Sequence, residues 1–289
     1  MARSWPDGLP ARLAGDDTLV MGVLNVTPDS FSDGGRYEDP VSAVAHGRTL
    51  IAQGASIVDV GGESTRPGAP RVDEQEELAR VVPVVAELAA EDVVVSVDTM
   101  RASVAAASVE AGALIVNDVS AGRADEDMGR QSARLRTRLG TPPVFIAMHW
   151  RGHSDVMNEL AVYTDVARDS AAELAERLEA LREAGVEDRF LVVDPGLGFS
   201  KTGEQNWEVL SRWELICGHG LPVLIGASRK RFVSTMGVDR DAATAAISAY
   251  SAEQGAWAVR VHEVPGSLAA VRVGDRLRRG RRELQEAGR

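Results

Sequence analysis

The sequence predicts one α/β domain, a single (β/α)8 TIM barrel in which eight parallel strands alternate with helices. Apolar runs of strand length alternate eight times with segments of helical spacing along the 289 residues, and no break in composition divides them. The runs are continuously apolar, as in strands buried on both faces. A doubly wound sheet is the alternative, but the glycine fingerprint that would favour it does not follow the first run.

The elements follow one another in regular order. Strands are expected near residues 18–24, 56–60, 93–97, 113–117, 143–147, 190–194, 222–226 and 257–261. Helices are expected near residues 40–54, 73–90, 101–111, 125–139, 162–184, 204–216, 238–253 and 265–279. Asp73 with Glu76 is a capping-box-like helix start, and glycines at 54, 112 and 185 stand where a left-handed residue ends a helix.

Composition limits the setting in which this protein works. We assign residues 1–17 to an N-terminal extension, 18–280 to the barrel and 281–289 to a C-terminal tail. A formal net charge of −11 argues against binding to nucleic acid or to an anionic membrane. The single Cys217 excludes an internal disulfide, and no stretch approaches transmembrane length. We therefore expect a cytoplasmic protein with small-molecule partners.

Charged side chains stand where apolar runs end. Asp98 and Asp194 close two of the runs, Arg260 closes a third, and Lys230 follows a fourth. Because an unpaired buried charge is costly, these groups are expected at the rim of the barrel. Active sites of such barrels lie at that end, so the four groups predict a polar mouth that faces a ligand.

The neighbours of these charges indicate the ligand's chemistry. A carboxylate beside the amide of Asn117 suits a ligand edge with adjacent N–H donors, such as a 2-amino-4-oxo pyrimidine. Met148 and Phe199 would cover a flat ring, and Arg260 could stack on it. The segment around Lys230 and the end of the eighth run, at Arg260 and His262, lie in the two loops that commonly bind phosphate in barrels.

Two strand–helix connections are unusually long. The first, residues 25–35, carries Phe31 and Asp33, and the second, residues 61–71, carries Arg66. Loops of this length in a compact domain are disproportionately functional. We expect long first and second loops that act as lids over the mouth.

Seven motifs carry a family resemblance. They are Met21-Gly-Val-Leu-Asn-Val-Thr-Pro-Asp-Ser-Phe-Ser-Asp-Gly-Gly, Asp59-Val-Gly-Gly-Glu-Ser-Thr-Arg-Pro-Gly, Ser96-Val-Asp-Thr, Asn117-Asp-Val-Ser, Asp194-Pro-Gly-Leu-Gly-Phe-Ser-Lys, Ser228-Arg-Lys-Arg and Arg260-Val-His. On these motifs the sequence resembles the dihydropteroate synthase family from residue 20 to 262. The resemblance implies a transferase of folate biosynthesis and a sulfonamide target. Its reaction joins 6-hydroxymethyl-7,8-dihydropterin pyrophosphate to p-aminobenzoate, giving 7,8-dihydropteroate and pyrophosphate by a cation-like substitution.

The resemblance also implies roles for residues. The pterin would be held by Asp98, Asn117, Met148, Asp194, Phe199, Gly226, Lys230 and Arg260. The p-aminobenzoate would be held by Phe31, Thr65, Pro67, Phe199 and Arg231. The pyrophosphate would be held by Asn25, Arg66, Arg260 and His262, with Asn25 as the one direct protein ligand of a Mg²⁺. Asp33, Arg66, Lys230, Arg260 and His262 would act in catalysis.

Some features depart from the family or leave alternatives open. Arg231 stands where many relatives carry a small hydroxyl residue, and the basic segment 130–141 is unexpected for a fourth helix. The alternatives are the pterin domain of a corrinoid methyltransferase and a non-catalytic paralogue that binds pterin. The resemblance further implies a homodimer with the C-terminal helices as the candidate interface.

Overall fold

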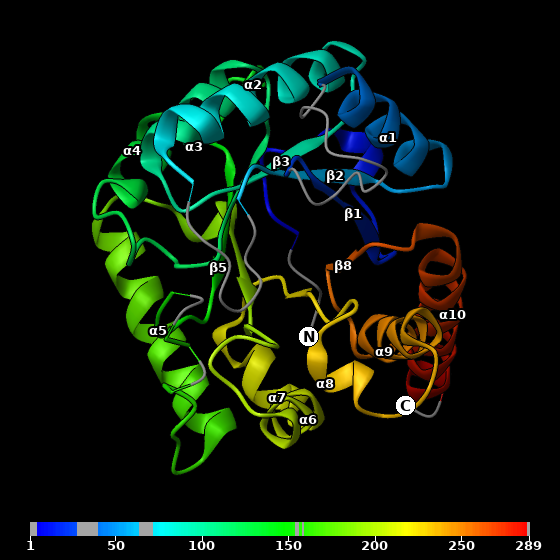
Figure 1. Cartoon of the computed structure of the whole chain (residues 1–289). Helices are drawn as coiled ribbons and strands as arrows, with labels where there is room; N and C mark the ends of the chain where they lie inside the picture. Colours follow the sequence, from blue (N-terminus) through cyan, green and yellow to red (C-terminus); the bar gives the residue numbers. More distant parts are fainter. Residues whose placement is uncertain (1–4, 28–39, 64–71, 154–155, 158, 288–289) are drawn as a thin grey trace.

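The structure is a computed structural model that describes residues 5–27, 40–63, 72–153, 156–157 and 159–287. In these residues the strands are β1 Leu19–Asn25, β2 Ile57–Gly61, β3 Val95–Asp98, β4 Ile115–Asp118, β5 Val144–Met148, β6 Leu191–Asp194, β7 Leu224–Ile225 and β8 Ala258–Val261. They pair in parallel in the order β6-β5-β4-β3-β2-β1-β8-β7. A further parallel bridge between Val193 and Val223 joins the two edges and closes the barrel (Figure 1). The predicted TIM barrel is confirmed.

Helices surround the strands on the outside of the barrel (Figure 1). They are α1 Pro40–Ala52, α2 Glu74–Ala90, α3 Ala102–Glu110, α4 Met128–Arg134, α5 Val166–Glu183, α6 Gly203–Ser211, α7 Trp213–Ile216, α8 Arg231–Ser234, α9 Arg240–Gln254 and α10 Val264–Ala287. The predicted start of α2 is confirmed, since the Asp73 side chain accepts from the Glu76 backbone N–H at 2.8 Å. The glycines at 54, 112 and 185 have φ values of 104°, 117° and 100°, so each ends its helix in the left-handed region.

Several helices differ from the expectation, three of them substantially. The expected helix 204–216 divides into α6 and α7, because Arg212 leaves helical geometry at φ −106° and ψ 58°. The helix expected over 125–139 is only α4. The last helix, expected over 265–279, continues to Ala287 through most of the stretch assigned to a tail.

The basic segment after α4 has a structural explanation. The Arg136 guanidinium donates to the carbonyls of Ala133 and Leu135, two acceptors that the end of α4 leaves open. Arg138 pairs with Asp92 at 3.1 Å across to the turn before β3. These arginines cap a helix and tie down a loop.

The buried apolar side chains form two main clusters, one inside the barrel and one between the strands and the surrounding helices. Side chains such as Met21, Ile57, Ile146 and Trp257 fill the interior, and each is completely buried. The N-terminal segment packs Trp5, Leu9 and Leu13 against this interior cluster. The N-terminal segment therefore closes the barrel at the amino ends of the strands, and the carboxyl ends are left as the open end.

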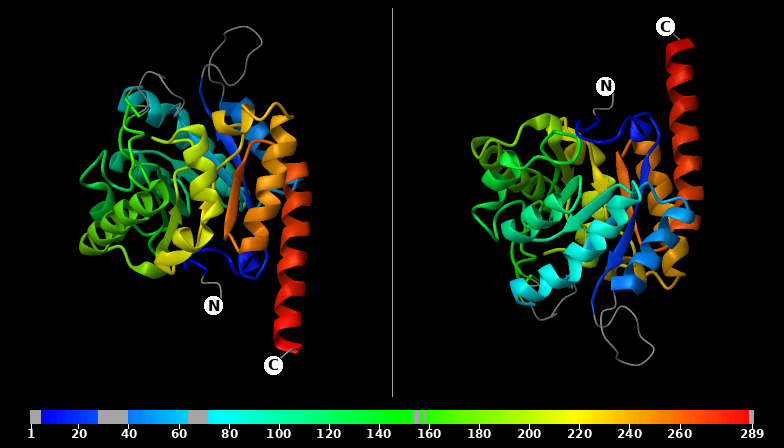
Figure 2. Two further views of the ribbon diagram at one scale, coloured as in Figure 1. Left: turned by 90° about the horizontal axis from the view of Figure 1, so that it is seen from below. Right: turned by 90° about the horizontal axis from the view of Figure 1, so that it is seen from above.

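The C-terminal helix stands along one side of the barrel. Figure 2 shows α10 (red) beside α9 and extending past the barrel at the end where the N-terminal segment lies. Buried Thr18, just before β1, donates its backbone N–H to Asp275 of α10 at 2.8 Å and its hydroxyl at 3.0 Å. No helix among the described residues is long and apolar enough to span a membrane.

Candidate active site

Arg260 holds together the open end of the barrel. It lies on β8, and its guanidinium donates from Nε to Asp59 of β2 at 2.5 Å and from a terminal nitrogen to Asp98 of β3 at 2.7 Å. Burial alone would lower the pKa of Arg260, but the two carboxylates outweigh it, and its pKa is raised. Three strands from the two ends of the chain thus share one buried ion-pair network.

Asp59 is the residue of this network that the sequence reasoning missed. Its side chain is completely buried. Besides Arg260, its Oδ2 accepts from the Asn117 amide at 3.2 Å, while its Oδ1 has no hydrogen-bond partner within the described ranges. Asp59 orients both a cation and an amide that the sequence placed in the pterin site. It stands inside an apolar run and not at its end, so the rule that found Asp98 could not find it.

A carboxylate and an ammonium face each other around Gly226. A Cβ built on Gly226 would lie 3.6 Å from Asp194 Oδ2, 3.7 Å from Lys230 Nζ and 4.0 Å from Arg260 Cβ. Because Gly226 has no side chain, a space stays open between Asp194 of β6, Lys230 before α8 and Arg260 of β8. Oδ1 of Asp194 already accepts the Gly196 backbone N–H at 2.7 Å, which leaves Oδ2 toward that space.

Burial shifts the ionisation of these groups. Burial raises the pKa of Asp98 to about 7, with Arg260 acting against it and Asp59 adding to it. Burial also raises the pKa of Asp194, although Lys230 lowers it. Burial lowers the pKa of Lys230 to about 8, and Asp194 opposes that shift. The site can thus exchange protons near neutral pH, as ligand-binding clefts with paired charges commonly do.

Apolar side chains form one wall of the mouth. Met148, which pairs in register with Asp194, belongs to a small cluster with Val119 and Trp150, and Phe199 packs against it. Lys230 Nζ lies 4.7 Å from the centre of the Phe199 ring. A flat heterocycle between this wall and the Asp98–Asp194 pair would meet both carboxylates along its edge.

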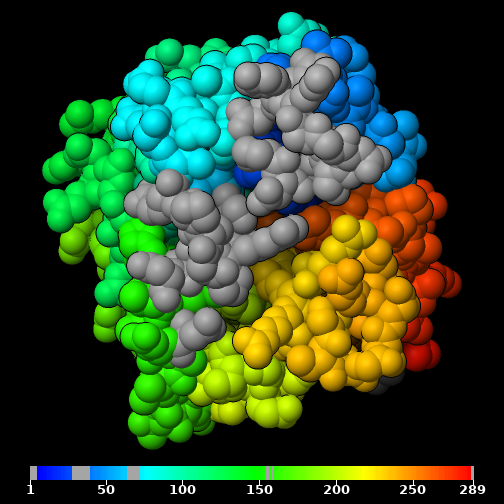
Figure 3. Space-filling view, in the orientation of Figure 1, coloured from blue at the N-terminus to red at the C-terminus, as the bar shows by residue number. Residues whose placement is uncertain are grey.

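The remaining predicted residues lie at other points of the rim. Asn25 ends β1 and lies opposite Gly61 of β2, which in turn lies opposite Asp98 of β3. His262 follows β8, and Ser228 Oγ lies 3.0 Å from its Nδ1 and 3.1 Å from its backbone N. Arg231 begins α8 and is exposed. Figure 3 shows this face, with the segment from β7 to α9 (yellow to orange) on one side of its centre.

Five predicted residues lie outside the described ranges. They are Phe31 and Asp33 in the first connection and Thr65, Arg66 and Pro67 in the second. Their proposed roles remain predictions from the sequence.

Comparisons with known proteins agree with this geometry. The family model of pterin binding enzymes matches residues 21–262. A dihydropteroate synthase of Mycobacterium leprae is 51% identical over 265 residues, which cover 88% of this chain and 91% of the relative. The chain belongs to the dihydropteroate synthase family.

Solved structures extend the comparison to three dimensions. The Yersinia pestis dihydropteroate synthase, solved with a sulfonamide drug, superimposes with a TM-score of 0.85 at 36% identity, covering 95% of this chain and 98% of that one. The Xanthomonas albilineans dihydropteroate synthase, solved with 4-aminobenzoic acid, gives a TM-score of 0.82 at 40% identity, covering 91% and 93%. The family assignment and the barrel therefore rest on independent likenesses of sequence and structure.

A second polar cluster beside the family's pterin motif was also missed. Lys201, the last residue of Asp194-Pro-Gly-Leu-Gly-Phe-Ser-Lys, is 8% exposed and lies 2.8 Å from Nδ1 of His149. The sequence signal that could have drawn attention to Lys201 is the scarcity of lysine in this chain. Of the 32 lysine and arginine residues, only Lys201 and Lys230 are lysines.

Proposed function

We infer that this chain is a dihydropteroate synthase. It condenses 6-hydroxymethyl-7,8-dihydropterin pyrophosphate with p-aminobenzoate to give 7,8-dihydropteroate and pyrophosphate. The observation that carries this inference is the convergence of Asp98, Asn117, Asp194 and Lys230 around the partly buried Arg260, in a chain whose relatives are dihydropteroate synthases. Small-molecule partners follow from the same relatives, two of which were solved with 4-aminobenzoic acid or a sulfonamide drug.

The residues divide the work according to charge. The carboxylates of Asp98 and Asp194 suit the N–H donors along the pterin edge, and Met148 with Phe199 suits its flat face. The bond from the pterin methylene carbon to oxygen breaks, and pyrophosphate leaves with the electron pair. The p-aminobenzoate nitrogen then bonds to that carbon and loses a proton. Cationic groups at the rim stabilise the leaving pyrophosphate, which is electrostatic catalysis at a preorganised site.

One assay separates this activity from the two alternatives. Purified protein is mixed with the pterin pyrophosphate, p-aminobenzoate and Mg²⁺, and pyrophosphate and dihydropteroate are measured. Equal amounts of both products are expected. Pterin binding without pyrophosphate release would instead favour a non-catalytic paralogue or a methyltransferase pterin domain.

We propose Mg²⁺ as the cofactor, with Asn25 as its one protein ligand. The Asn25 amide oxygen is a hard donor at the end of β1. In the parallel sheet Asn25 lies opposite Gly61 of β2, and Gly61 lies opposite Asp98 of β3. Mg²⁺ commonly takes one or two protein oxygens and fills its other positions with waters and substrate phosphates. When bound, the ion would neutralise charge on the diphosphate.

This proposal predicts a shift in metal dependence. Chelation with EDTA should abolish pyrophosphate release, and added Mg²⁺ should restore it. Asn25→Ala should need a higher Mg²⁺ concentration for half-maximal rate while pterin affinity measured without metal stays unchanged. The same Mg²⁺ dependence in Asn25→Ala and parent would remove Asn25 from the metal site.

We propose that the protein is a homodimer that pairs through α10. Val273, Leu277 and Leu284 are 58%, 59% and 76% exposed, and their spacing puts them on one stripe of the helix. An exposed apolar stripe on a long helix favours a partner surface. Leu277→Asp should shift the protein toward monomer in analytical ultracentrifugation, whereas Arg276→Asp, one position away, should not.

The cytoplasmic location stays a prediction from the single Cys217.

A further inference from the structure

The use of lysine in this chain is selective. Arginine supplies nearly all of the 32 lysine and arginine side chains, and both lysines stand at the mouth of the barrel. Lysine differs from arginine in presenting three donors around one nitrogen, whereas arginine presents a planar fork. Lys230 faces the ligand space beside Gly226, whereas the ammonium of Lys201 lies against His149. Lys201 therefore has a role other than facing this space.

The three donors of Lys201 have three acceptors. Its Nζ lies 2.8 Å from Nδ1 of His149, 3.2 Å from the Gly196 carbonyl and 3.3 Å from the Phe199 carbonyl. This buried ammonium is thus fully hydrogen-bonded, as burial of such a charge requires. Two of its acceptors belong to the turn that links β6 to α6.

That turn is conformationally demanding. Gly196, Gly198 and Ser200 have φ values of 68°, 81° and 48°, and a positive φ is uncommon for a residue other than glycine. A Cβ on Gly196 would lie only 2.2 Å from the His149 carbonyl oxygen, so the turn presses against the end of β5. Such a backbone persists only when its surroundings hold it in place.

The same turn presents three groups of the pterin site. Its Gly196 N–H binds Asp194, and its Leu197 carbonyl accepts from Lys230. The ring of Phe199 lies under the Lys230 ammonium. Any movement of the turn would move a carboxylate, an ammonium and an aromatic wall together.

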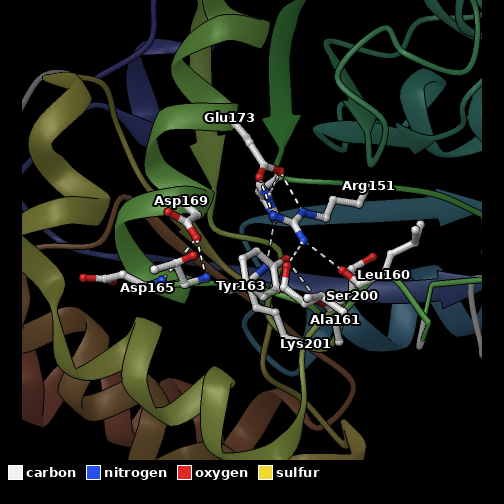
Figure 4. Close-up of polar contacts among 12 residues, drawn as sticks. Arg151, Leu160, Ala161, Tyr163, Asp165, Asp169, Glu173, Ser200 and Lys201 are labelled. Atoms are coloured by element: carbon white, nitrogen blue, oxygen red, sulfur yellow. Dashed lines mark hydrogen bonds and ion pairs between the residues drawn. The ribbon is translucent and has the colours of Figure 1, made fainter.

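The turn and its lysine are tied to α5 by a partly buried chain of polar groups. Nε2 of His149 lies 3.0 Å from Glu173, and Arg151 donates to the same carboxylate at 2.9 Å. The Arg151 guanidinium stacks 3.6 Å from the Tyr163 ring, whose hydroxyl donates to the Ser200 carbonyl at 2.9 Å. Figure 4 shows this chain, with Glu173 and Arg151 at one side and Ser200 and Lys201 beside Tyr163.

We propose that Lys201 is a positioning residue of the pterin site. Its ammonium locks the 196–200 turn against His149 and thereby sets the orientation of Asp194 and Phe199 and of the carbonyl that holds Lys230. This inference rests on the proposed function, because it assigns Lys201 to the pterin half of that reaction. Lys201 itself does not touch the substrate.

The charges around Lys201 agree with this role. Burial lowers the pKa of Lys201 to about 7, Asp194 raises it, and Lys230 and Arg151 lower it further. Burial and the Lys201 charge lower the pKa of His149 to about 4, so a neutral imidazole accepts at Nδ1 and donates from Nε2 to Glu173. The positive charge of Lys201 in turn favours the ionised form of Asp194.

The test compares Lys201→Met with the parent. The methionine keeps the length and apolar body of the side chain but removes three donors and the charge. The dissociation constant of 6-hydroxymethylpterin and the KM of the pterin pyrophosphate should rise about 10- to 100-fold, by analogy with the loss of metal affinity that follows removal of a group that orients metal ligands. The KM of p-aminobenzoate should rise less, since Phe199 is the one group held by this turn that is also expected in the p-aminobenzoate pocket. If the parent protein releases no pyrophosphate, the proposed function is refuted, and this result is obtained before any variant is compared.

Control variants separate positioning from folding. Tyr163→Phe removes one bond to the same turn, at Ser200, but leaves the three Lys201 donors, so its pterin affinity should stay close to that of the parent. Lys201→Gln retains two donors and should show an intermediate loss, and it replaces Lys201→Met if that variant does not fold. Folded Lys201→Met or Lys201→Gln with parental pterin affinity would overturn the proposal, even if its melting temperature were lower.

The scarcity of lysine allows a direct check of the contact. Parent protein labelled with [¹³Cε]lysine contains only two such groups, and the signal lost in Lys201→Met or Lys201→Gln identifies Lys201. Its titration midpoint should lie near 7 and not near 10.5. As pH rises through that value, Asp194 loses a neighbouring positive charge, so parental pterin affinity should fall more steeply than that of the two variants, in which Asp98 and Lys230 still titrate in this range. A midpoint near 10.5 would contradict the buried contact.

Discussion

Arg260→Met is expected to lower the free energy of unfolding by about 3–5 kcal/mol, the usual cost of removing one partner from a buried ion pair. Asp59 is completely buried and Asp98 is 9% exposed, so neither carboxylate can turn to water when the guanidinium is lost. Each acid must then either stay charged without its partner or take up a proton inside the barrel. Pterin binding should also be lost, since Arg260 orients both acids.

Urea denaturation at neutral pH measures this loss, and Arg130→Met is the matched control. Arg130 pairs with Asp127 on the surface, where both side chains are 60–70% exposed, so its removal should cost less than about 1 kcal/mol. The double variant Arg260→Met with Asp59→Asn should be more stable than Arg260→Met alone, because one of the stranded charges is gone. An unfolding free energy of Arg260→Met equal to that of the parent would contradict the ion-pair network.

The loss in Arg260→Met should depend on pH with a definite sign. Burial raises the pKa of Asp98 above its ordinary value of 3.8, to about 7 with Arg260 present. Arg260 lowers that pKa, so its removal raises the pKa further. The folded variant then binds more protons than the unfolded chain from about pH 4 upward, and its stability falls as pH rises. A stability gap between parent and variant that narrows from pH 5 to pH 8 would refute this reasoning.

The part of the site that could be predicted is the part that lies at strand ends. Asp98, Asp194 and Arg260 each close an apolar run, and parallel strands bring such ends to one edge, so their meeting follows from local pattern. Asp59 and Lys201 do not follow from that rule. Asp59 interrupts its run, and Lys201 is seven residues beyond β6 in a turn whose glycine-rich backbone decides where its ammonium goes.

The helices show the same division between local and distant causes. The start of α2 follows from Asp73 alone, because an N-cap is a contact within one turn. The break between α6 and α7 does not, since Arg212 there bonds Asp165, which lies 47 positions earlier at the start of α5. Contacts between segments that are far apart in sequence leave no periodic signal in either segment.

Asp194→Asn is expected to weaken pterin binding by about 1.5–3 kcal/mol, the usual contribution of a hydrogen bond to a charged group. The substitution keeps the shape of the side chain and an oxygen for the Gly196 N–H. It places an N–H₂ group on the side that faces Gly226, where the pterin edge would offer its own donors. Two donors cannot bond each other, so about a 10- to 150-fold rise in the dissociation constant follows.

Calorimetric titration with 6-hydroxymethylpterin measures this change, and Asp118→Asn is the control. Asp118 also ends a strand and is completely buried, and burial raises its pKa to about 6. Its oxygens accept from the backbone of Ser120 at 2.8 Å and of Gly122 at 2.6 Å, so its carboxylate serves the chain and not a ligand. Asp118→Asn should therefore lose stability with unchanged pterin affinity. Equal losses of pterin affinity in the two variants would show that a strand-end acid matters only through the fold, and the assignment of Asp194 to the pterin would fail.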